Sequence, residues 1–326
     1  MDKIKNFDIV VNTCLADIES RSKKSDFDKN DFLLSVVNGF EDGKWREDLF
    51  RQFVMNNIAQ TGLSADEREN ICTIDPYTQI TRSIMNLRLV DCENGQGSEI
   101  AEIVLYGIMR YHYNALPVVP KIFYKQNSND NAKGADSVHI VIDEDKMDFT
   151  LWLGEAKFFN DIIDERLYDP INSVFEALGT EKIKKENSII TNIKDLEYVI
   201  NNPDIRKKVK EVLRHDVSID EVKKRLHVPI MLLHECSITK GARELSPEYL
   251  EEIKHYHLNR AERFFMSHNN KQKKEGVYGF EKIMFHLILF PVPNKENIVN
   301  WFVKRANQIN KMLESEVLIS VIISTN

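Results

Sequence analysis

The spacing of apolar residues along the chain separates candidate strands from candidate helices. Short apolar runs rich in β-branched residues predict strands at residues 7–11, 137–142, 149–153, 228–236 and 283–290. Residues 116–124 indicate an edge strand, because prolines stand near its beginning and proline cannot donate a hydrogen bond to a neighbouring strand. The apolar end of the chain, residues 317–323, is predicted to form a last strand.

Other segments repeat their apolar residues with the period of an α-helix. They predict helices at residues 31–40, 45–59, 99–113, 162–178, 247–267 and 295–313, with a break near Pro170 in the fourth. Ser98, Ser246 and Asn294 are the expected N-caps of three of them. Strands that alternate with helices in this way imply a mixed β-sheet covered on both faces, so the predicted fold class is α/β.

The glycine-containing segment 94–97 divides the chain into two predicted domains. Residues 1–96 are expected to form an N-terminal subdomain of mixed structure, and residues 97–326 a second, larger domain. Within the second domain, residues 180–226 predict a charged helical insertion, in which Ser218 and Glu221 have the spacing of a capping box.

Composition and charge narrow the class of protein. A chain of 326 residues with 42% hydrophobic and 29% charged residues has enough material for one large core or two small ones. The N-terminus carries acidic residues and only a short apolar run, and no stretch has the length of a membrane span, so the expected location is the cytoplasm. The net charge of −7 is opposite in sign to that of a typical stand-alone DNA-binding protein.

Several common site motifs are missing from the sequence. Its four cysteines are scattered without C-x-x-C spacing, which argues against a zinc ribbon and a disulfide framework. Gly95 and Gly97 are not followed by Gly-Lys-Ser/Thr, so the segment is not a phosphate-binding loop, and no G-x-S-x-G elbow is present. If the protein works in an ATP-dependent pathway, another subunit must hydrolyse the ATP.

The two runs at 137–142 and 149–153 predict a hairpin that carries the main candidate site. If Ile142 pairs with Phe149, Asp136 falls opposite Glu155, and the two-residue period places Lys157 on the same face. Carboxylates roughly 5 Å apart repel each other unless a cation lies between them. The pattern therefore predicts a divalent-metal site, and the alternative is an ordinary hairpin with a solvated polar face.

The residues around this site resemble a known class of nucleases. Asp136 at the start of one strand, with Glu155 and Lys157 near the end of the next, is similar to the signature of the PD-(D/E)XK nuclease superfamily. The fuller string runs from Lys133 through Gly134, Ala135 and Asp136 to His139, followed by Leu-Gly-Glu-Ala-Lys at 153–157. More narrowly, it resembles the nuclease subunit of Hachiman anti-phage defence systems. The proline of the nominal motif is absent.

This resemblance implies a restriction-endonuclease-like mixed β-sheet flanked by helices, and Mg²⁺-dependent hydrolysis of DNA, with Mn²⁺ as a substitute metal. Asp136 and Glu155 would bind the metal together with the backbone carbonyl of Ala156. Lys157 would orient the attacking water or stabilise the developing negative charge. A helicase or ATPase subunit of the same system would be the partner.

The same resemblance implies a third metal-binding carboxylate on the helix before the hairpin. Glu99 and Glu102 lie three residues apart on one side of the first turns of that helix, and either one could fill this place. The alternative is that both only compensate the helix dipole, as acidic residues at helix N-termini commonly do.

Basic residues in three other places are candidate contacts to a phosphate backbone. They are Lys133 before the hairpin, Lys207 and Lys208 in the insertion, and Lys273 and Lys274 in a predicted loop at 271–274. Acidic neighbours in the insertion also fit a solvated helix face. Two other functions stay open: a catalytically silent DNA-binding or scaffold subunit, and a nuclease that acts on RNA or in repair.

Overall fold

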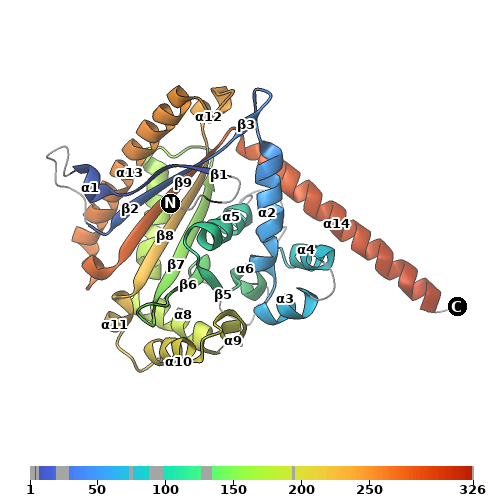
Figure 1. Ribbon diagram of the computed structural model, residues 1–326, viewed down its shortest axis with the longest axis horizontal. Coiled ribbons are helices and arrows are strands. Elements are labelled where there is room, and N and C mark those ends of the chain that lie inside the picture. The colour runs from blue at the N-terminus through green and yellow to red at the C-terminus, as the bar shows by residue number, and fades with distance from the viewer. Residues whose placement is uncertain are drawn as a thin grey trace.

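The computed structural model describes residues 4, 7–19, 29–72, 76–87, 98–125, 134–192 and 195–324. Its centre is a seven-stranded mixed sheet with the strand order β1-β2-β9-β8-β7-β6-β5 (Figure 1). The strands are β1 (Phe7–Cys14), β2 (Asp31–Asn38), β5 (Leu116–Val119), β6 (Ser137–Asp143), β7 (Asp148–Phe159), β8 (Leu226–Glu235) and β9 (Met284–Val292). Neighbours among β2, β9, β8 and β7 run parallel, whereas β1, β6 and β5 are each antiparallel to the strand beside them.

Helices cover both faces of this sheet, as the sequence predicted. Apolar residues on one face pack against α2 (Glu47–Gly62), α5 (Ser98–His112) and the first half of α14 (Lys295–Ser324). Those on the other face pack against α7 (Asp164–Ala177), α8 (Thr180–Asn192), α10 (Pro203–Val212) and α13 (Pro247–Glu275). The α/β fold class is therefore confirmed.

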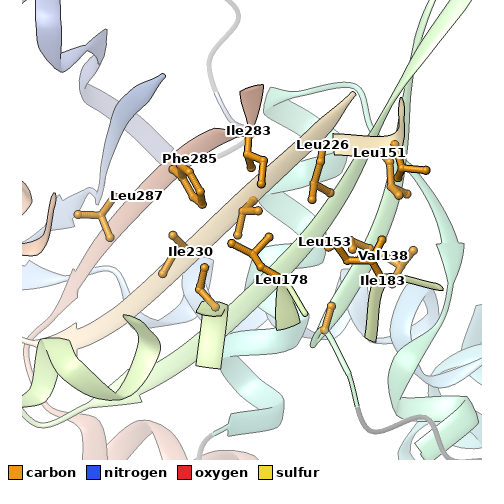
Figure 2. Close-up of a cluster of buried hydrophobic side chains, with 14 of the residues drawn as sticks. Val138, Leu151, Leu153, Leu178, Ile183, Leu226, Ile230, Ile283, Phe285 and Leu287 are labelled. Carbon is orange, nitrogen blue, oxygen red and sulfur yellow. The ribbon is translucent and has the colours of Figure 1, made fainter. Parts of the chain in front are cut away.

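Alternation along β7 divides its side chains between these two cores. Leu151 and Leu153 belong to the core under α7 and α8, where they lie with Val138 and Ile183 (Figure 2). Trp152 and Ala156 belong to the core on the α5 face. Because side chains in a strand alternate between faces, Glu155 and Lys157 follow Leu151 and Leu153 toward α7.

Most of the predicted elements are present, with three corrections. Residues 31–40 were predicted to be helical but contain β2, which is buried on both faces and therefore lacks the alternation that identifies a strand. Residues 116–124 contain a shorter edge strand, β5, followed by α6 (Lys121–Lys125). The predicted last strand at 317–323 is wrong, because α14 continues to Ser324 and projects away from the sheet (Figure 1).

Two helices are more continuous than the sequence predicted. Pro170 lies inside α7 without ending it. The segment 271–274 is not a loop, because α13 runs to Glu275 and ends at Gly276 in the left-handed conformation with φ 65°. Lys273 and Lys274 thus lie in the last helical turn, where positive charge is favourable.

Several shorter strands and helices lie outside the central sheet and its main helices. A small hairpin of β3 (Phe40–Glu41) and β4 (Lys44–Trp45) precedes α2, and α3 (Ala65–Cys72) and α4 (Pro76–Met85) follow it. Residues 180–226 contain helices as predicted, among them α9 (Asp195–Val199) and α11 (Ile219–Lys223), whose N-cap is Ser218. The predicted boundary at 94–97 lies outside the described residues. None of the helices in the described ranges has the length and apolar character needed to cross a membrane.

Candidate active site

The candidate site lies where β6 and β7 separate. The predicted register is confirmed, since Ile142 pairs with Phe149 and the ladder continues to Ser137 opposite Gly154. β6 begins at Ser137, whereas β7 extends to Phe159 while pairing with β8 on its other side. We call this opening between the start of β6 and the end of β7 the fork.

Asp136 stands at the fork, one residue before β6. Its backbone N–H donates to the carbonyl of Gly154 at 2.8 Å, and its Oδ2 accepts a hydrogen bond from the N–H of Ala156 at 3.1 Å. The ladder therefore ends one pair earlier than the sequence predicted, and two hydrogen bonds to β7 hold Asp136 in place of a regular pairing with Glu155.

The backbone of Ala156 also faces the fork. Its N–H points to Asp136, and the N–H and C=O groups of one residue in a strand point to the same neighbouring strand. The carbonyl of Ala156 is thus directed into the opening that β6 leaves. The carbonyl of Ala156 needs this orientation for its predicted role as an oxygen ligand of a metal ion.

Glu155 is a buried carboxyl group, with 7% of its surface exposed. Burial raises its pKa, and the charge of Asp136 raises it further, to about 7 from the ordinary 4.5. The Nζ atom of Lys157 lies 2.5 Å from Oε1 of Glu155, and a hydrogen bond from Ser173 of α7 also favours the charged form. The structure therefore brings Asp136, Glu155 and Lys157 together.

Lys157 is a cation at neutral pH in this setting. Its burial would lower the pKa of the ammonium group, but the charges of Glu155 and Asp136 outweigh burial and raise the pKa above 10.5. A group with a raised pKa is a poor proton acceptor. It is suited to hold a water molecule or an anionic oxygen.

The surroundings of Glu155 explain its burial. It lines a cavity of about 10 Å³ with Ala135, Leu153 and Gly154 from the hairpin, Val228 from β8, and Val174, Ala177 and Leu178 from α7 and its C-cap. This volume is close to the minimum for one water molecule. The lining is mainly apolar, which disfavours the charged form of the carboxyl group.

The two glutamates of α5 differ in burial. Glu102 is 4% exposed, and its charge contributes to the raised pKa of Lys157, which places it within electrostatic reach of the fork. Glu99 is half-buried. Within the described part of the chain, no three His, Cys, Asp or Glu side chains are close enough to form a metal site.

The donor set at the fork nevertheless fits one kind of metal ion. Asp136, Glu155 and the Ala156 carbonyl offer oxygen atoms only, the ligand type that Mg²⁺ prefers. Mg²⁺ commonly uses one or two protein carboxylates and keeps several water molecules. A third carboxylate in direct contact is therefore not a requirement for binding.

Among the predicted basic contacts, Lys208 lies away from the fork. Lys208 contacts Asp148 at 3.2 Å and the carbonyl of Met147, at the opposite end of β7, so the rise along a strand puts it roughly 20 Å from Glu155. Lys207 is exposed on α10, Lys273 and Lys274 are exposed on α13, and Lys133 lies outside the described residues.

The comparison with known proteins gives a family match over most of the chain. A protein-family model described as HamA matches residues 11–306. This match covers every residue of the fork, the sheet apart from the first residues of β1, and the helical layers apart from the end of α14. A search of curated proteins found no match.

Proposed function

The chain belongs to the HamA family of Hachiman anti-phage defence systems, and from this premise we propose that it is the Mg²⁺-dependent DNA nuclease subunit of such a system. The observation that carries the proposal is the fork, where Asp136, Glu155 and Lys157 converge beside an inward-facing backbone carbonyl. A hairpin with a merely solvated polar face would not bury a glutamate to 7% exposure.

The order of elements around the fork supports the same reading. α5, β5, the β6–β7 hairpin, α7 and β8 follow one another along the chain, with the carboxylates at the splayed end of the hairpin. The first part of this order, a helix, a strand and then the hairpin, is the one expected from the resemblance to PD-(D/E)XK nucleases. Glu102 on α5 would then supply the third carboxylate, in the outer shell or as a ligand.

Each residue of the fork has a distinct chemical task in this proposal. Asp136, Glu155 and the Ala156 carbonyl would hold Mg²⁺, or Mn²⁺ in its place. When bound, the ion makes a coordinated water more acidic and offsets negative charge on the phosphate. Glu155 must give up its proton for this role, and its pKa of about 7 places that loss near neutral pH.

Lys157 would act on the reacting groups as a fixed cation. Its ammonium group donates hydrogen bonds to the attacking water or to a phosphate oxygen on which charge develops. The raised pKa keeps it protonated, so it orients and stabilises and does not remove the proton.

Control of the activity would come from a partner. A net charge of −7 and the scattered basic residues offer little to select or hold DNA, and the sequence contains no phosphate-binding loop. We therefore place a helicase or ATPase subunit beside this chain in the cytoplasm. The insertion at 180–226 and the N-terminal subdomain are the candidate surfaces for that partner.

The direct test is a cleavage assay with a matched pair of variants. The purified chain, alone and with its partner and ATP, is incubated with plasmid, linear DNA and RNA in Mg²⁺, Mn²⁺ or EDTA. Glu155→Ala with Lys157→Ala is expected to abolish cleavage and phage protection. Glu144→Ala with Lys146→Ala has the same spacing in the exposed hairpin turn and is expected to leave both unchanged.

The assay separates the proposal from its alternatives. Cleavage of RNA alone would reassign the substrate. No cleavage under any condition, with phage protection retained in the Glu155 and Lys157 variant, would identify a catalytically silent subunit. A folded Glu155 and Lys157 double variant that still cuts DNA would refute the site.

A further inference from the structure

A buried ion pair lies next to the fork and is not explained by the proposed chemistry. Lys121, the first residue of α6, is 0% exposed, and Glu186 of α8 is 3% exposed. The Nζ atom of Lys121 lies 2.7 Å from Oε1 and 2.6 Å from Oε2 of Glu186, so the lysine binds both carboxylate oxygens.

Glu186 also contacts the segment that leads into Asp136. Its Oε1 accepts a hydrogen bond from the backbone N–H of Ala135 at 3.1 Å. At Gly134, an added Cβ would lie only 1.9 Å from the same Oε1 atom. The glycine is therefore needed for the close approach of Glu186, which gives a physical reason for glycine at position 134.

The segment 134–136 is consequently held from two sides. On one side, Glu186 binds the N–H of Ala135; on the other, Asp136 is bound to β7 through Gly154 and Ala156. Because two adjacent peptide N–H groups are fixed to different elements, φ and ψ of Ala135 have little freedom, and the peptide that leads into Asp136 is held in one orientation. The direction of the Asp136 carboxylate is set by this arrangement.

Energetics favour a role in orientation over a role in bulk stability. Replacing a buried ion pair by apolar residues of similar size is often neutral or stabilising, because both charges lose their hydration in the interior. This pair lies beside the carboxylates of the fork, and one oxygen of Glu186 accepts a hydrogen bond from the backbone of Ala135. The pair is therefore better explained by the position in which it holds that backbone.

We propose that Glu186, paired with Lys121, is a positioning residue that fixes residues 134–136 and aims the Asp136 carboxylate at the metal position. This inference rests on the proposed nuclease function. It also makes α8, the first helix of the insertion, part of the support of the site.

Two double variants test this role, because one keeps an acceptor oxygen at position 186 and the other does not. Lys121→Met with Glu186→Gln removes both charges but keeps an oxygen for the Ala135 N–H. Lys121→Met with Glu186→Leu removes both charges and the oxygen. Mg²⁺ binding is measured by titration calorimetry, cleavage as a function of Mg²⁺ concentration, and folding by thermal unfolding.

The Gln variant is expected to bind Mg²⁺ within a few-fold of the parent chain. The Leu variant should stay folded but bind Mg²⁺ at least about tenfold more weakly, the loss usual for partners that orient a metal ligand. Gly134→Ala should weaken binding similarly, because it displaces Glu186.

Three results would overturn the inference while leaving the nuclease function in place. They are a folded Leu variant with unchanged Mg²⁺ dependence, equal losses in the Gln and Leu variants, and losses that follow the drop in unfolding temperature alone. A parent chain that neither binds Mg²⁺ nor cleaves, with or without its partner, would instead refute the proposed function on which the inference depends.

Discussion

Glu155→Gln is expected to make the protein more stable while it abolishes cleavage. In the metal-free protein the pKa of Glu155 is raised to about 7, mainly by burial and then by the charge of Asp136. The charged carboxylate is therefore a cost to the folded state. Glutamine keeps the size of the side chain and a hydrogen-bonding group for Ser173, but it carries no charge to bury.

The size of the effect follows from the pKa. Each pH unit between the ordinary 4.5 and about 7 corresponds to about 1.4 kcal/mol, which gives a cost of about 3 kcal/mol for the ionised form. Because the pKa of this acid is higher in the folded than in the unfolded state, the cost is fully present above pH 7 and absent below pH 4.5. The free energy of unfolding of the variant should thus be higher than that of the parent chain by up to about 3 kcal/mol at pH 8 and equal to it at pH 4.5.

Urea unfolding in EDTA at these two pH values measures the difference. Glu165→Gln, an exposed substitution at the start of α7, is the control and should change little at either pH. Added Mg²⁺ at pH 8 should raise the stability of the parent chain, because it binds the folded state, but not that of Glu155→Gln. A variant that is no more stable at pH 8, or is equally more stable at both pH values, would contradict the assigned cost of burial.

Three further predictions concern other residues and the partner. Glu102→Ala should raise the Mg²⁺ concentration needed for cleavage several-fold more than Glu99→Ala, and small equal effects would assign both to the helix dipole. Burial would raise the pKa of Asp148, but its hydrogen bonds with Arg225, Phe149 and Lys208 outweigh burial and lower the pKa to about 2. The ionised carboxylate therefore stabilises the folded state above pH 3.8, and this stabilisation is lost as the pH falls through 2. Asp148→Asn should lower the free energy of unfolding in urea by about 1 kcal/mol at pH 7 and by less at pH 3. Co-expression with the proposed helicase or ATPase subunit should give a stable complex that cleaves DNA in an ATP-dependent way, and unregulated cutting by the lone chain without a complex would contradict this.

The hairpin register could be predicted from the sequence because it depends on local information. Two β-branched runs and a polar turn fix the pairing of Ile142 with Phe149, and the two-residue period then fixes which side chains share a face. The same reasoning placed Asp136, Glu155 and Lys157 together. It missed only the end of the ladder, which depends on how Asp136 is held by Gly154 and Ala156.

Contacts between distant segments were beyond sequence reasoning. Ser173 and Glu186 reach the fork from helices whose packing sets their direction, and no spacing rule connects either one to the hairpin. β2 was mistaken for a helix for a related reason, since a strand buried on both faces shows no polar alternation. Gly134 was the one available clue to Glu186, because its lack of a side chain permits the close approach.

The pairing of β2 with β9 has a consequence for how the protein is made. Asp31 pairs with Phe285, so the first strand pair of the chain meets its parallel neighbour only after about 250 further residues have been synthesised. At ordinary ribosomal rates that interval is roughly ten seconds or more. During it the apolar β2 exposes an unpaired edge, the kind of surface that promotes aggregation. The hairpin residues of the fork all lie between 136 and 157, so they are synthesised long before the sheet around them is closed.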